Sequence, residues 1–348
     1  MTFDPDAASL PDSGIFGLPS DPARAEVHVI PVPFDVTTSY RKGTCRGPDA
    51  ILRASRQVDL FDLLTGRPYE RGIVMLEADE RIAKLNVEGG RKAEKIIEVA
   101  GVLGGDPALE KTLARVNAIG AQLNELVHAA TELAFAQKKL PVLVGGDHST
   151  PFGAIQAAAE RFPGLGVLHF DAHADLRDAF EGFEWSHASI LHNVATRIPA
   201  VAKIAQVGIR DFGEREFAFI QESRGRIRTL FDADWQRAKL DGGNLRELVK
   251  KRLDDLPAKV WVTFDVDGLD PTLCPNTGTP VPGGLAWSEA MLWLEELAKS
   301  GREVVGLDLN EVSPGATPDD EDGWDAIVGA RLLYRLIGVA LMTRPTQR

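Results

Sequence analysis

Acidic and histidine side chains gather in two short motifs whose spacing suits a metal site. One motif is DAHAD at residues 171–175, and the other is DVD at residues 265–267. Residues two apart in an extended chain point to the same side, so each motif presents its charged and imidazole groups together. Carboxylate oxygens with a minority of imidazole nitrogens suit a hard or borderline divalent ion such as Mn²⁺ or Ni²⁺. The two motifs therefore predict metal binding.

Two further motifs place polar residues at comparable points of the chain. GGDHS at 145–149 follows the apolar run 141–144, and DLNE at 308–311 follows the run 303–307. Apolar runs also precede DAHAD and DVD. In open parallel sheets, ligands bind beyond the carboxyl ends of the strands. If each run is a strand, all four motifs lie at one edge of one sheet.

The candidate metal ligands comprise two histidines and four aspartates, namely His148, Asp171, His173, Asp175, Asp265 and Asp267. So many ligands with so few histidines indicate two divalent ions that share bridging carboxylates. Two such ions would balance the charge of the four aspartates, and a bridging hydroxide would then make the site attractive to a cation. Paired ions also lower the pKa of bound water and so supply a nucleophile at neutral pH.

Each motif has a simpler interpretation when taken alone. An Asp-rich turn after a strand is commonly a turn or a helix cap, because Asp favours such positions. His148 alone would be an ordinary histidine at a helix start, with Ser149 and Thr150 as caps. The joint occurrence of the motifs after several strand candidates favours the metal site.

The runs that precede the motifs belong to a longer series of strand candidates. Eight runs rich in β-branched residues alternate with helical patterns, at residues 26–32, 72–76, 141–146, 165–170, 204–208, 226–230, 259–264 and 303–307. The longest helical pattern, 108–137, repeats apolar residues at intervals of three and four. Alternation of this kind with nearly wholly apolar strands predicts an α/β fold, a parallel sheet with helices on both faces.

No Pro/Ser-rich linker and no block of charge divides the chain, so we expect one domain over residues 25–348. Residues 1–24 are expected to form a loosely structured N-terminal arm. A glycine-rich stretch and the long helical pattern together predict a helical excursion at about 77–138. The 348 residues suffice for a large core, although the usual domain size of about 150 residues would allow two domains.

The charge balance narrows the range of partners. The 51 acidic residues against 39 basic ones give a net charge of -12, which repels phosphate backbones and anionic membranes and attracts cations. We therefore expect neither a nucleic-acid nor a membrane partner.

The stretch 326–342 is the most apolar, but Arg331 and Arg335 interrupt it and it falls short of the ~20 residues of a membrane span. It predicts a buried core helix.

The expected location is the cytoplasm. The first residues are acidic and lack the basic and apolar regions of a secretory signal. Cys45 and Cys274 lie far apart and outside any CxxC spacing, which fits a reducing compartment without structural zinc.

Several motifs together resemble the ureohydrolase family of arginases, agmatinases and related guanidino-compound hydrolases. They are GGDHS, DAHAD, FDVDGLDP, NTGTPVPGGL and NEVSP, and the resemblance extends from about residue 25 to 341. It implies a three-layer αβα arginase-like fold around an eight-stranded parallel sheet. It also implies a homo-oligomer, commonly a trimer or hexamer.

The resemblance assigns a role to each motif residue. The first metal would be bound by His148, Asp171, Asp175 and Asp265, and the second by His173, Asp171, Asp265 and Asp267. Glu311 matches the glutamate that pairs with the substrate guanidinium, and His187 matches a histidine that shuttles protons. Without the resemblance, Glu311 would read as an exposed loop acid and His187 as a cap or packing residue.

The loop after DAHAD separates members of this family. Arginases resemble one another in a polar loop that holds the substrate carboxylate, whereas residues 176–186 are acidic and aromatic here. A substrate carboxylate is therefore disfavoured, and we expect Arg177 to pair with Asp178 or Glu181 at the surface. The candidate specificity residues are Phe180, Glu181, Phe183, Glu184 and Trp185. The aromatic rings of Phe180, Phe183 and Trp185 would cap a small cation, although ordinary packing of the loop is an equal alternative.

Other segments resemble an agmatinase-like subgroup that includes nickel-dependent guanidine hydrolases, among them SGIFGLP at 13–19 and VGARLLYRL at 328–336. This resemblance favours hydrolysis of guanidine or a small alkylguanidine or biguanide, such as dimethylguanidine or a metformin-like compound, with Ni²⁺ or Mn²⁺. Agmatine is the alternative substrate. Two further alternatives are a deacetylase on the related fold and a subunit of a hetero-oligomer that needs a related partner for activity.

Overall fold

A computed structural model describes residues 4–315 and 323–344, and a single parallel β-sheet runs through it. Within these residues the sheet has eight strands in the order β2-β1-β3-β8-β7-β4-β5-β6. Their bounds are β1 Val27–Val32, β2 Ile73–Met75, β3 Leu140–Gly145, β4 Leu165–Phe170, β5 Val201–Ile209, β6 Ile227–Phe231, β7 Lys259–Asp265 and β8 Glu303–Asn310. The predicted strands and the α/β fold with an eight-stranded parallel sheet are confirmed.

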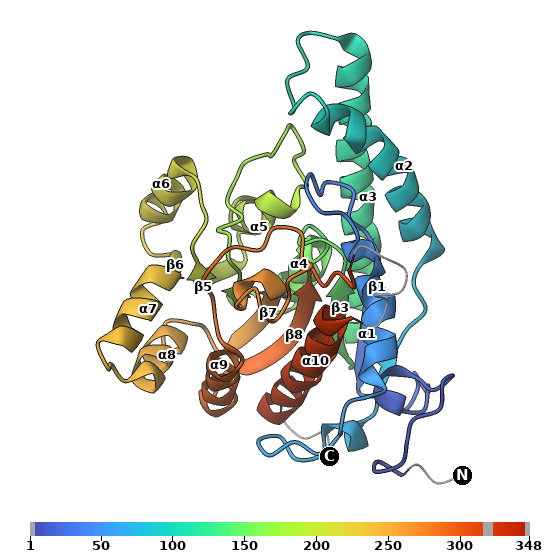
Figure 1. Cartoon of the computed structure of the whole chain (residues 1–348), viewed down its shortest axis with the longest axis vertical. Helices are drawn as coiled ribbons and strands as arrows, with labels where there is room; N and C mark the ends of the chain where they lie inside the picture. Colours follow the sequence, from blue (N-terminus) through green and yellow to red (C-terminus); the bar gives the residue numbers. More distant parts are fainter. Residues whose placement is uncertain (1–3, 316–322, 345–348) are drawn as a thin grey trace.

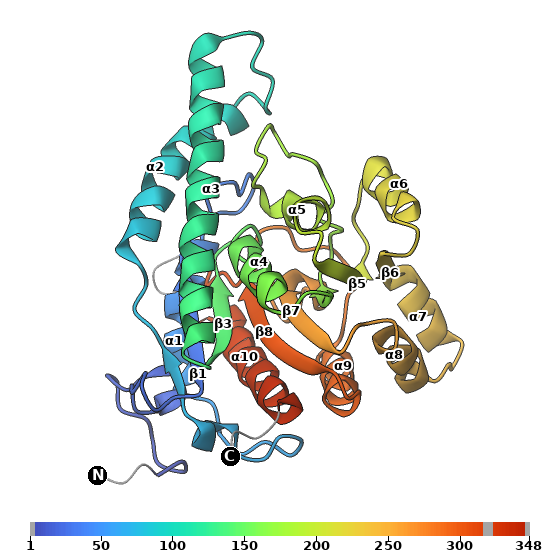
Figure 2. The same cartoon turned by 180° about the vertical axis from the view of Figure 1, so that it is seen from behind.

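Ten helices cover the two faces of the sheet in the described residues (Figures 1 and 2). One face is packed by α1 Gly47–Ser55, α7 Asp232–Leu240, α8 Leu245–Leu253, α9 Trp287–Lys299 and α10 Trp324–Thr343. The other is packed by α2 Glu80–Ile97, α3 Pro107–Ala136, α4 Phe152–Arg161, α5 Ile190–Arg197 and α6 Glu214–Glu222. The molecule therefore has the three layers of the predicted αβα architecture.

The central strands are apolar on both sides because helices cover both faces. β1, β3 and β4 are buried along their whole length. Helix α10 has the length and apolarity of a membrane span, yet 72% of its most apolar window is buried inside the fold. The predicted core helix at 326–342 is confirmed.

The predicted helical excursion consists of α2 and α3, which lie between β2 and β3 in sequence. Asp79 and Asp106 cap these helices by accepting hydrogen bonds from the backbone N–H groups of Arg81 and Ala108. Helix α3 is 30 residues long and extends well past the sheet, so that its far end and α2 project from the molecule (Figure 1). The predicted helix at 108–137 is thereby confirmed.

Part of the expected N-terminal arm is packed rather than loose. Ile15 and Phe16 are buried in a short 3₁₀ turn, Ile15–Gly17. The ring of Phe16 lies edge-on to Tyr334 at 4.9 Å, and its backbone N–H donates to Ser55 Oγ at 2.8 Å. Burial of these two apolar side chains fixes this part of the arm against the fold. Residues 1–3 of the arm and 345–348 of the expected domain lie outside the described residues.

The order of strands brings the four motifs together. β3, β8, β7 and β4 are neighbours at the centre of the sheet, although β3 and β4 come early in the chain and β7 and β8 late. The chain leaves β3 for β4, a strand three positions away, and β7 and β8 later fill the gap between them. In parallel sheets ligand sites form where the strand order changes in this way. The site is thus expected at the carboxyl ends of these four strands.

Candidate metal centre and active-site cavity

His148 is the focus of a first group of predicted ligands. Its Nδ1 lies 2.9 Å from Asp171 Oδ2, 3.2 Å from Asp175 Oδ2 and 3.4 Å from Asp265 Oδ2. All four side chains are buried. Asp171 and Asp175 reach His148 from the segment that follows β4, and Asp265 reaches it from the end of β7.

A second group forms around His173. Its Nδ1 lies 2.9 Å from Asp267 Oδ2 and 3.5 Å from Asp171 Oδ1. Asp171 belongs to both groups, with Oδ2 facing His148 and Oδ1 facing His173. The potential ligand atoms of His148, His169, Asp171 and Asp175 lie within 4.8 Å of one another, as do those of Asp171, His173 and Asp267. The structure therefore brings all six predicted ligands together, with Asp171 in the position that a bridging carboxylate would occupy.

The donor set fits divalent ions because, in the described residues, no Lys or Arg side chain forms an ion pair with the buried carboxylates. Among residues 4–315 and 323–344, the ion pairs of Asp171, Asp175, Asp265 and Asp267 are all with histidines. Burial, with the Asp171 charge nearby, raises the pKa of Asp175 to about 7. Burial together with repulsion from Asp267 and Asp171 raises the pKa of Asp265 well above its usual value. Bound cations would relieve this repulsion.

Two further polar residues, Thr263 and His169, hold the ligands in place and were not identified from the sequence. Thr263 Oγ1 lies 2.8 Å from His148 Nε2 and itself donates to Asp308 Oδ1 at 2.6 Å. His169 Nε2 lies 2.8 Å from Asp171 Oδ2. Such partners fix the ring and carboxylate orientations at a metal site. Thr263 and His169 each lie two residues before a motif aspartate, so the same-side spacing was the signal that could have found them.

The backbone of the site is under local constraint. Asp175 and Glu311 have φ values of 53° and 63°, in the left-handed region that side chains other than Gly disfavour. Gly146 in GGDHS must be glycine, because a Cβ there would lie 1.8 Å from the carbonyl oxygen of Phe34. This close approach joins the end of β3 to the loop that follows β1.

Glu311 lies beside the metal-ligand cluster, at the end of β8. Its Oε1 accepts a hydrogen bond from the backbone N–H of His148 at 3.0 Å, whereas its buried Oε2 has no hydrogen-bond partner in the described residues. Burial, with repulsion from Asp265 and Asp147, raises the pKa of Glu311 well above its usual value. A cation placed at Oε2 would give this unpaired oxygen a partner and would offset the negative charge of the carboxylate.

His187 lines a cavity together with the predicted ligands His173 and Asp175. It begins a 3₁₀ turn, His187–Ser189, that leads into α5. Its Nδ1 lies 3.4 Å from Thr37 Oγ1, and its ring centroid is 6.3 Å from that of Phe180. Burial lowers the pKa of His187 to about 4, and charges on His173 and His148 act in the same direction. The imidazole is therefore neutral near pH 7.

The cavity over these residues is small, about 180 Å³ in volume. Its lining includes two predicted ligands, His187, and one aromatic residue of the predicted specificity loop. The full set is Ser39, His173, Asp175, Arg177, Phe180, His187, Ala188, Asp211, Glu216 and Thr279. Asp211 and Glu216 were not identified from the sequence, because α6 and the turn before it carry no motif.

The predicted pairing of Arg177 with Asp178 or Glu181 is wrong. Arg177 Nε lies 3.7 Å from Glu216 Oε2, and its guanidinium covers the ring of Phe180 at 5.2 Å. Glu216 is buried and also accepts from the backbone N–H of Leu176 at 2.9 Å. A tertiary partner on α6 therefore displaced the local pairs that sequence proximity suggested.

The other predicted specificity residues point away from this cavity. Phe183 is fully buried in the core, and Trp185 packs on Phe152 with ring centroids 4.9 Å apart. Glu184 lies exposed with its carboxylate 3.3 Å from Arg197, and Glu181 Oε2 is buried without a hydrogen-bond partner in the described residues. Of the five candidates, only Phe180 is placed to contact a small molecule in the cavity.

Helix α3 fixes this loop from the side. Asn117 Nδ2 donates to the carbonyl oxygen of Gly182 at 3.1 Å, and Asn117 Oδ1 accepts from the backbone N–H of Glu184 at 3.0 Å. A Cβ on Gly120 would lie only 2.6 Å from the Cβ of Trp185. The projecting helix thus sets where the loop, and Phe180 with it, can lie.

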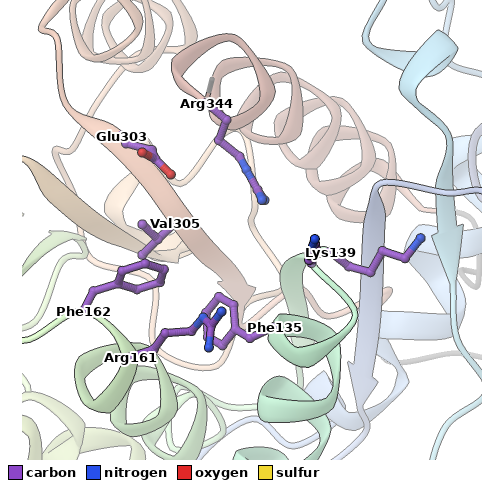
Figure 3. A pocket seen from close by; sticks show the side chains of 8 residues that line it. Phe135, Lys139, Arg161, Phe162, Glu303, Val305 and Arg344 are labelled. Carbon is purple, nitrogen blue, oxygen red and sulfur yellow. The ribbon is translucent and has the colours of Figure 1, made fainter. Parts of the chain in front are cut away.

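A second hollow, of about 460 Å³, lies at the opposite edge of the sheet, near the start of β3 and β8 (Figure 3). Arg344 and Arg161 extend into it, and Phe135 and Phe162 form apolar walls. None of the predicted catalytic or metal-binding residues lines it. The chemistry of the four motifs therefore belongs to the smaller cavity.

Comparisons with known proteins identify relatives of the whole chain. Residues 25–338 match the arginase family. The chain is 33% identical over 328 residues to an N(1)-aminopropylagmatine ureohydrolase of Thermus thermophilus, covering 93% of this chain and 94% of that protein. It is 30% identical over 325 residues to proclavaminate amidinohydrolase of Streptomyces clavuligerus, covering 91% of each chain.

Solved structures share the fold. A structure of the Streptomyces clavuligerus proclavaminate amidinohydrolase has a TM-score of 0.69 and 24% identity, over 97% of this chain and 100% of that one. A structure of arginase from Bacillus subtilis has a TM-score of 0.63 and 24% identity, over 90% and 98% of the two chains. The likeness supports the three-layer architecture described above.

Replacing Asp267 by Ala is expected to reduce the bound metal from two ions per chain to one and to abolish nearly all turnover. The reason is that Asp267 is the closest carboxylate to His173. Metal content per chain, measured by plasma mass spectrometry, tests this. Asp270→Ala, a nearby acid that accepts hydrogen bonds from Thr272, serves as the control and should keep both ions. Full activity with one ion per chain in the unaltered protein would contradict a dinuclear site.

Replacing Thr263 by Val is expected to lower metal affinity about 10- to 100-fold, the usual cost of losing a hydrogen-bond partner of a metal-binding histidine. The ring of His148 then loses the acceptor that fixes its orientation. Competition against a chelator measures the affinity. Thr131→Val removes an equally buried hydroxyl on α3, remote from the site, and should leave the affinity unchanged. Equal affinities for both variants would remove Thr263 from the support of the site.

Proposed function

The chain belongs to the arginase family, and on that basis we propose that it hydrolyses a C–N bond of guanidine or of a small alkylguanidine or biguanide. Dimethylguanidine and metformin-like compounds are the alkylated examples. Water is consumed, and the products are urea or a substituted urea together with ammonia or an amine. Hydrolysis of a linear amidine is also what the names of its relatives describe, among them the Pseudomonas aeruginosa guanidinobutyrase.

The observation that carries the proposal is the size of the cavity. Its volume is about 180 Å³. Pockets for drug-sized ligands are commonly about 300–1,000 Å³. A planar guanidinium with a nucleophilic water fits such a space, whereas a long tail would have to leave it past Arg177 and Phe180.

The charges around the cavity support a cationic substrate without a carboxylate. Glu311 offers an unpaired acceptor oxygen, and Asp211 and Glu216 add acidic groups to the wall. The one arginine of the lining, Arg177, lies against Glu216 and Phe180. A substrate carboxylate would have to compete with Glu216 for it, which disfavours guanidino acids.

The chain's own residues supply binding and proton transfer. When bound, two divalent ions held by His148, His173 and the four aspartates would supply Lewis acidity and lower the pKa of a water molecule. Glu311 Oε2 binds the substrate guanidinium and orients its carbon. His187, neutral near pH 7, takes the proton that water loses as it adds to that carbon, and then delivers it to the departing nitrogen.

Hydrolysis of agmatine is the second candidate function. The relatives named as aminopropylagmatine ureohydrolases and agmatinase act on substrates with a cationic tail, and Asp211 at the cavity wall could receive a distal ammonium. The proposal also includes Ni²⁺ or Mn²⁺ as the metal and a cytoplasmic location. It further includes assembly as a trimer or hexamer, or as a complex with a related subunit.

Product release by the purified chain tests the substrate. We would load the protein separately with nickel and manganese and compare guanidine, methylated guanidines, a dimethylbiguanide, agmatine, 4-guanidinobutyrate and arginine. The highest kcat/KM is expected on guanidine or one of its small derivatives. Preference for agmatine would replace the proposal by the second candidate. Activity that appears only with a co-purified related subunit would assign this chain to a hetero-oligomer.

Replacing Glu311 by Gln is expected to raise KM roughly tenfold to a hundredfold, the loss of one hydrogen bond to a charged partner at about 1.5–3 kcal/mol. Bound metal should stay unchanged, since Glu311 is not among the predicted ligands. Steady-state kinetics and metal content measure the two quantities. Glu303→Gln changes a carboxylate at the other end of β8 and serves as the control. Unchanged kinetics in the Glu311 variant would remove this residue from substrate binding.

A further inference from the structure

A threonine that no motif includes lies between the ring of His187 and a buried carboxylate. Thr37 belongs to the loop after β1 and is 3% exposed. Its Oγ1 lies 3.4 Å from Asp147 Oδ2, 3.4 Å from His187 Nδ1 and 3.4 Å from the backbone nitrogen of His187. One hydroxyl therefore contacts an acid, an imidazole and a backbone N–H.

The direction of each hydrogen bond follows from what each group can donate. A hydroxyl has one proton to give and two lone pairs that accept. The backbone N–H of His187 can only donate, so it takes one lone pair of Thr37 Oγ1. Asp147 acts as an acceptor, because its other oxygen already receives the backbone N–H and the hydroxyl of Ser149. The Thr37 proton therefore goes to Asp147, which leaves only an acceptor for His187 Nδ1.

We propose that Thr37 is a positioning residue that holds His187 as the tautomer protonated at Nδ1, with Nε2 as the basic nitrogen. This inference rests on the proposed function, in which His187 transfers protons within the cavity that it lines. Nδ1–H donates to Thr37, and Thr37 donates to Asp147. The order Asp147, Thr37, His187 thus orients the ring from behind, as a carboxylate orients a catalytic histidine directly in other hydrolases.

This tautomer sets the order of proton movements. Nε2 carries a lone pair at the start, so His187 first accepts the proton that water loses when its oxygen bonds to the guanidinium carbon. The same Nε2 then gives that proton to the nitrogen whose bond to the carbon breaks. The imidazole ends neutral, with its proton again at Nδ1, and one water has been consumed for each amine released.

Hydrogen bonds on both sides of Thr37 fix the loop that carries it. Asp35 Oδ2 accepts from the backbone N–H groups of Gly43 at 3.0 Å and Cys45 at 3.3 Å. The backbone N–H of Asp35 donates to Asn86 Oδ1 on α2 at 2.8 Å. These bonds hold the turn against the site, so Thr37 has little freedom to leave His187.

The three contacts of Thr37 are long for hydrogen bonds, which commonly lie at about 2.7–3.0 Å. Catalytic hydrogen bonds are often long in unliganded sites and shorten in the substrate complex. A second hydroxyl, that of Thr38, lies 3.5 Å from the same Asp147 oxygen but forms no hydrogen bond with His187. Thr38 therefore serves as a matched control for the contact between Thr37 and His187.

The experiment combines nitrogen spectroscopy with kinetics on the full chain. ¹⁵N solid-state NMR of histidine-labelled, zinc-loaded protein distinguishes protonated from unprotonated ring nitrogens, and Zn²⁺ is diamagnetic. The chain has seven histidines, and His187→Gln identifies the signals of this one. The variants are Thr37→Val, Thr37→Ser and Thr38→Val, which all preserve the approximate volume of a buried side chain.

We expect His187 of the unaltered protein to be protonated at Nδ1 and bare at Nε2. Thr37→Val should mix the tautomers and lower kcat about tenfold, the equivalent of one hydrogen bond, while KM changes little. Thr37→Ser should restore both the spectrum and kcat, and Thr38→Val should leave the His187 signals unchanged. A merely structural role of Thr37 would affect KM and stability without moving the tautomer.

Two results would overturn the inference. One is a His187 ring protonated at Nε2 in the unaltered protein, and the other is a Thr37→Val spectrum identical to that of the parent. Full activity of His187→Gln would instead contradict the proposed function, because His187 would then have no part in proton transfer. The spectrum reports on Thr37 without any turnover, so the two failures are distinguishable.

Discussion

Four buried carboxylates lie close together with no Lys or Arg ion pair among the described residues, and the rest of the site depends on this constraint. Removing charges from water is costly, and like charges in a poorly polarisable interior repel one another strongly. The protein offsets part of this cost with backbone donors. The N–H groups of His173 and Ala172 donate to Asp171 and Asp267 at 2.6 Å and 2.9 Å, and that of Asp267 donates to Asp265 at 2.8 Å. Divalent ions would offset the remainder.

The parallel sheet explains how these charges can be kept so close. The carboxyl ends of β3, β8, β7 and β4 lie side by side, and helices on both faces bury the strands that lead to them. Trp261 on β7 packs over Gly306 on β8, where a Cβ would lie 2.1 Å from the indole, and its Nε1 donates to Asp308. Core packing between two strands thereby supports the residues that hold His148.

Two loops complete the cavity over the metal-ligand cluster, and each is anchored by a distant element. The loop after β1 brings Thr37 to His187 and Asp147, and it is held against α2 by Asn86. The loop after β4 brings Phe180 and is held by Asn117 of α3 and by Glu216 of α6. The small volume of the cavity, and with it the proposed preference for a compact substrate, depends on these anchors rather than on the motifs.

The sequence alone determined the eight strands, the α/β class and the six clustered His and Asp side chains, because two-residue spacing and strand periodicity are local properties of the chain. It also determined the core helix, from an apolar stretch that is interrupted by Arg331 and Arg335 and is shorter than a membrane span. Contacts between distant segments were decided only by the tertiary structure. Arg177 pairs with Glu216 instead of a neighbour, Phe183 and Trp185 pack inward while Phe180 alone faces the cavity, and Ile15 and Phe16 join the core. Each of these outcomes depends on which surface another element presents, and no local pattern encodes that.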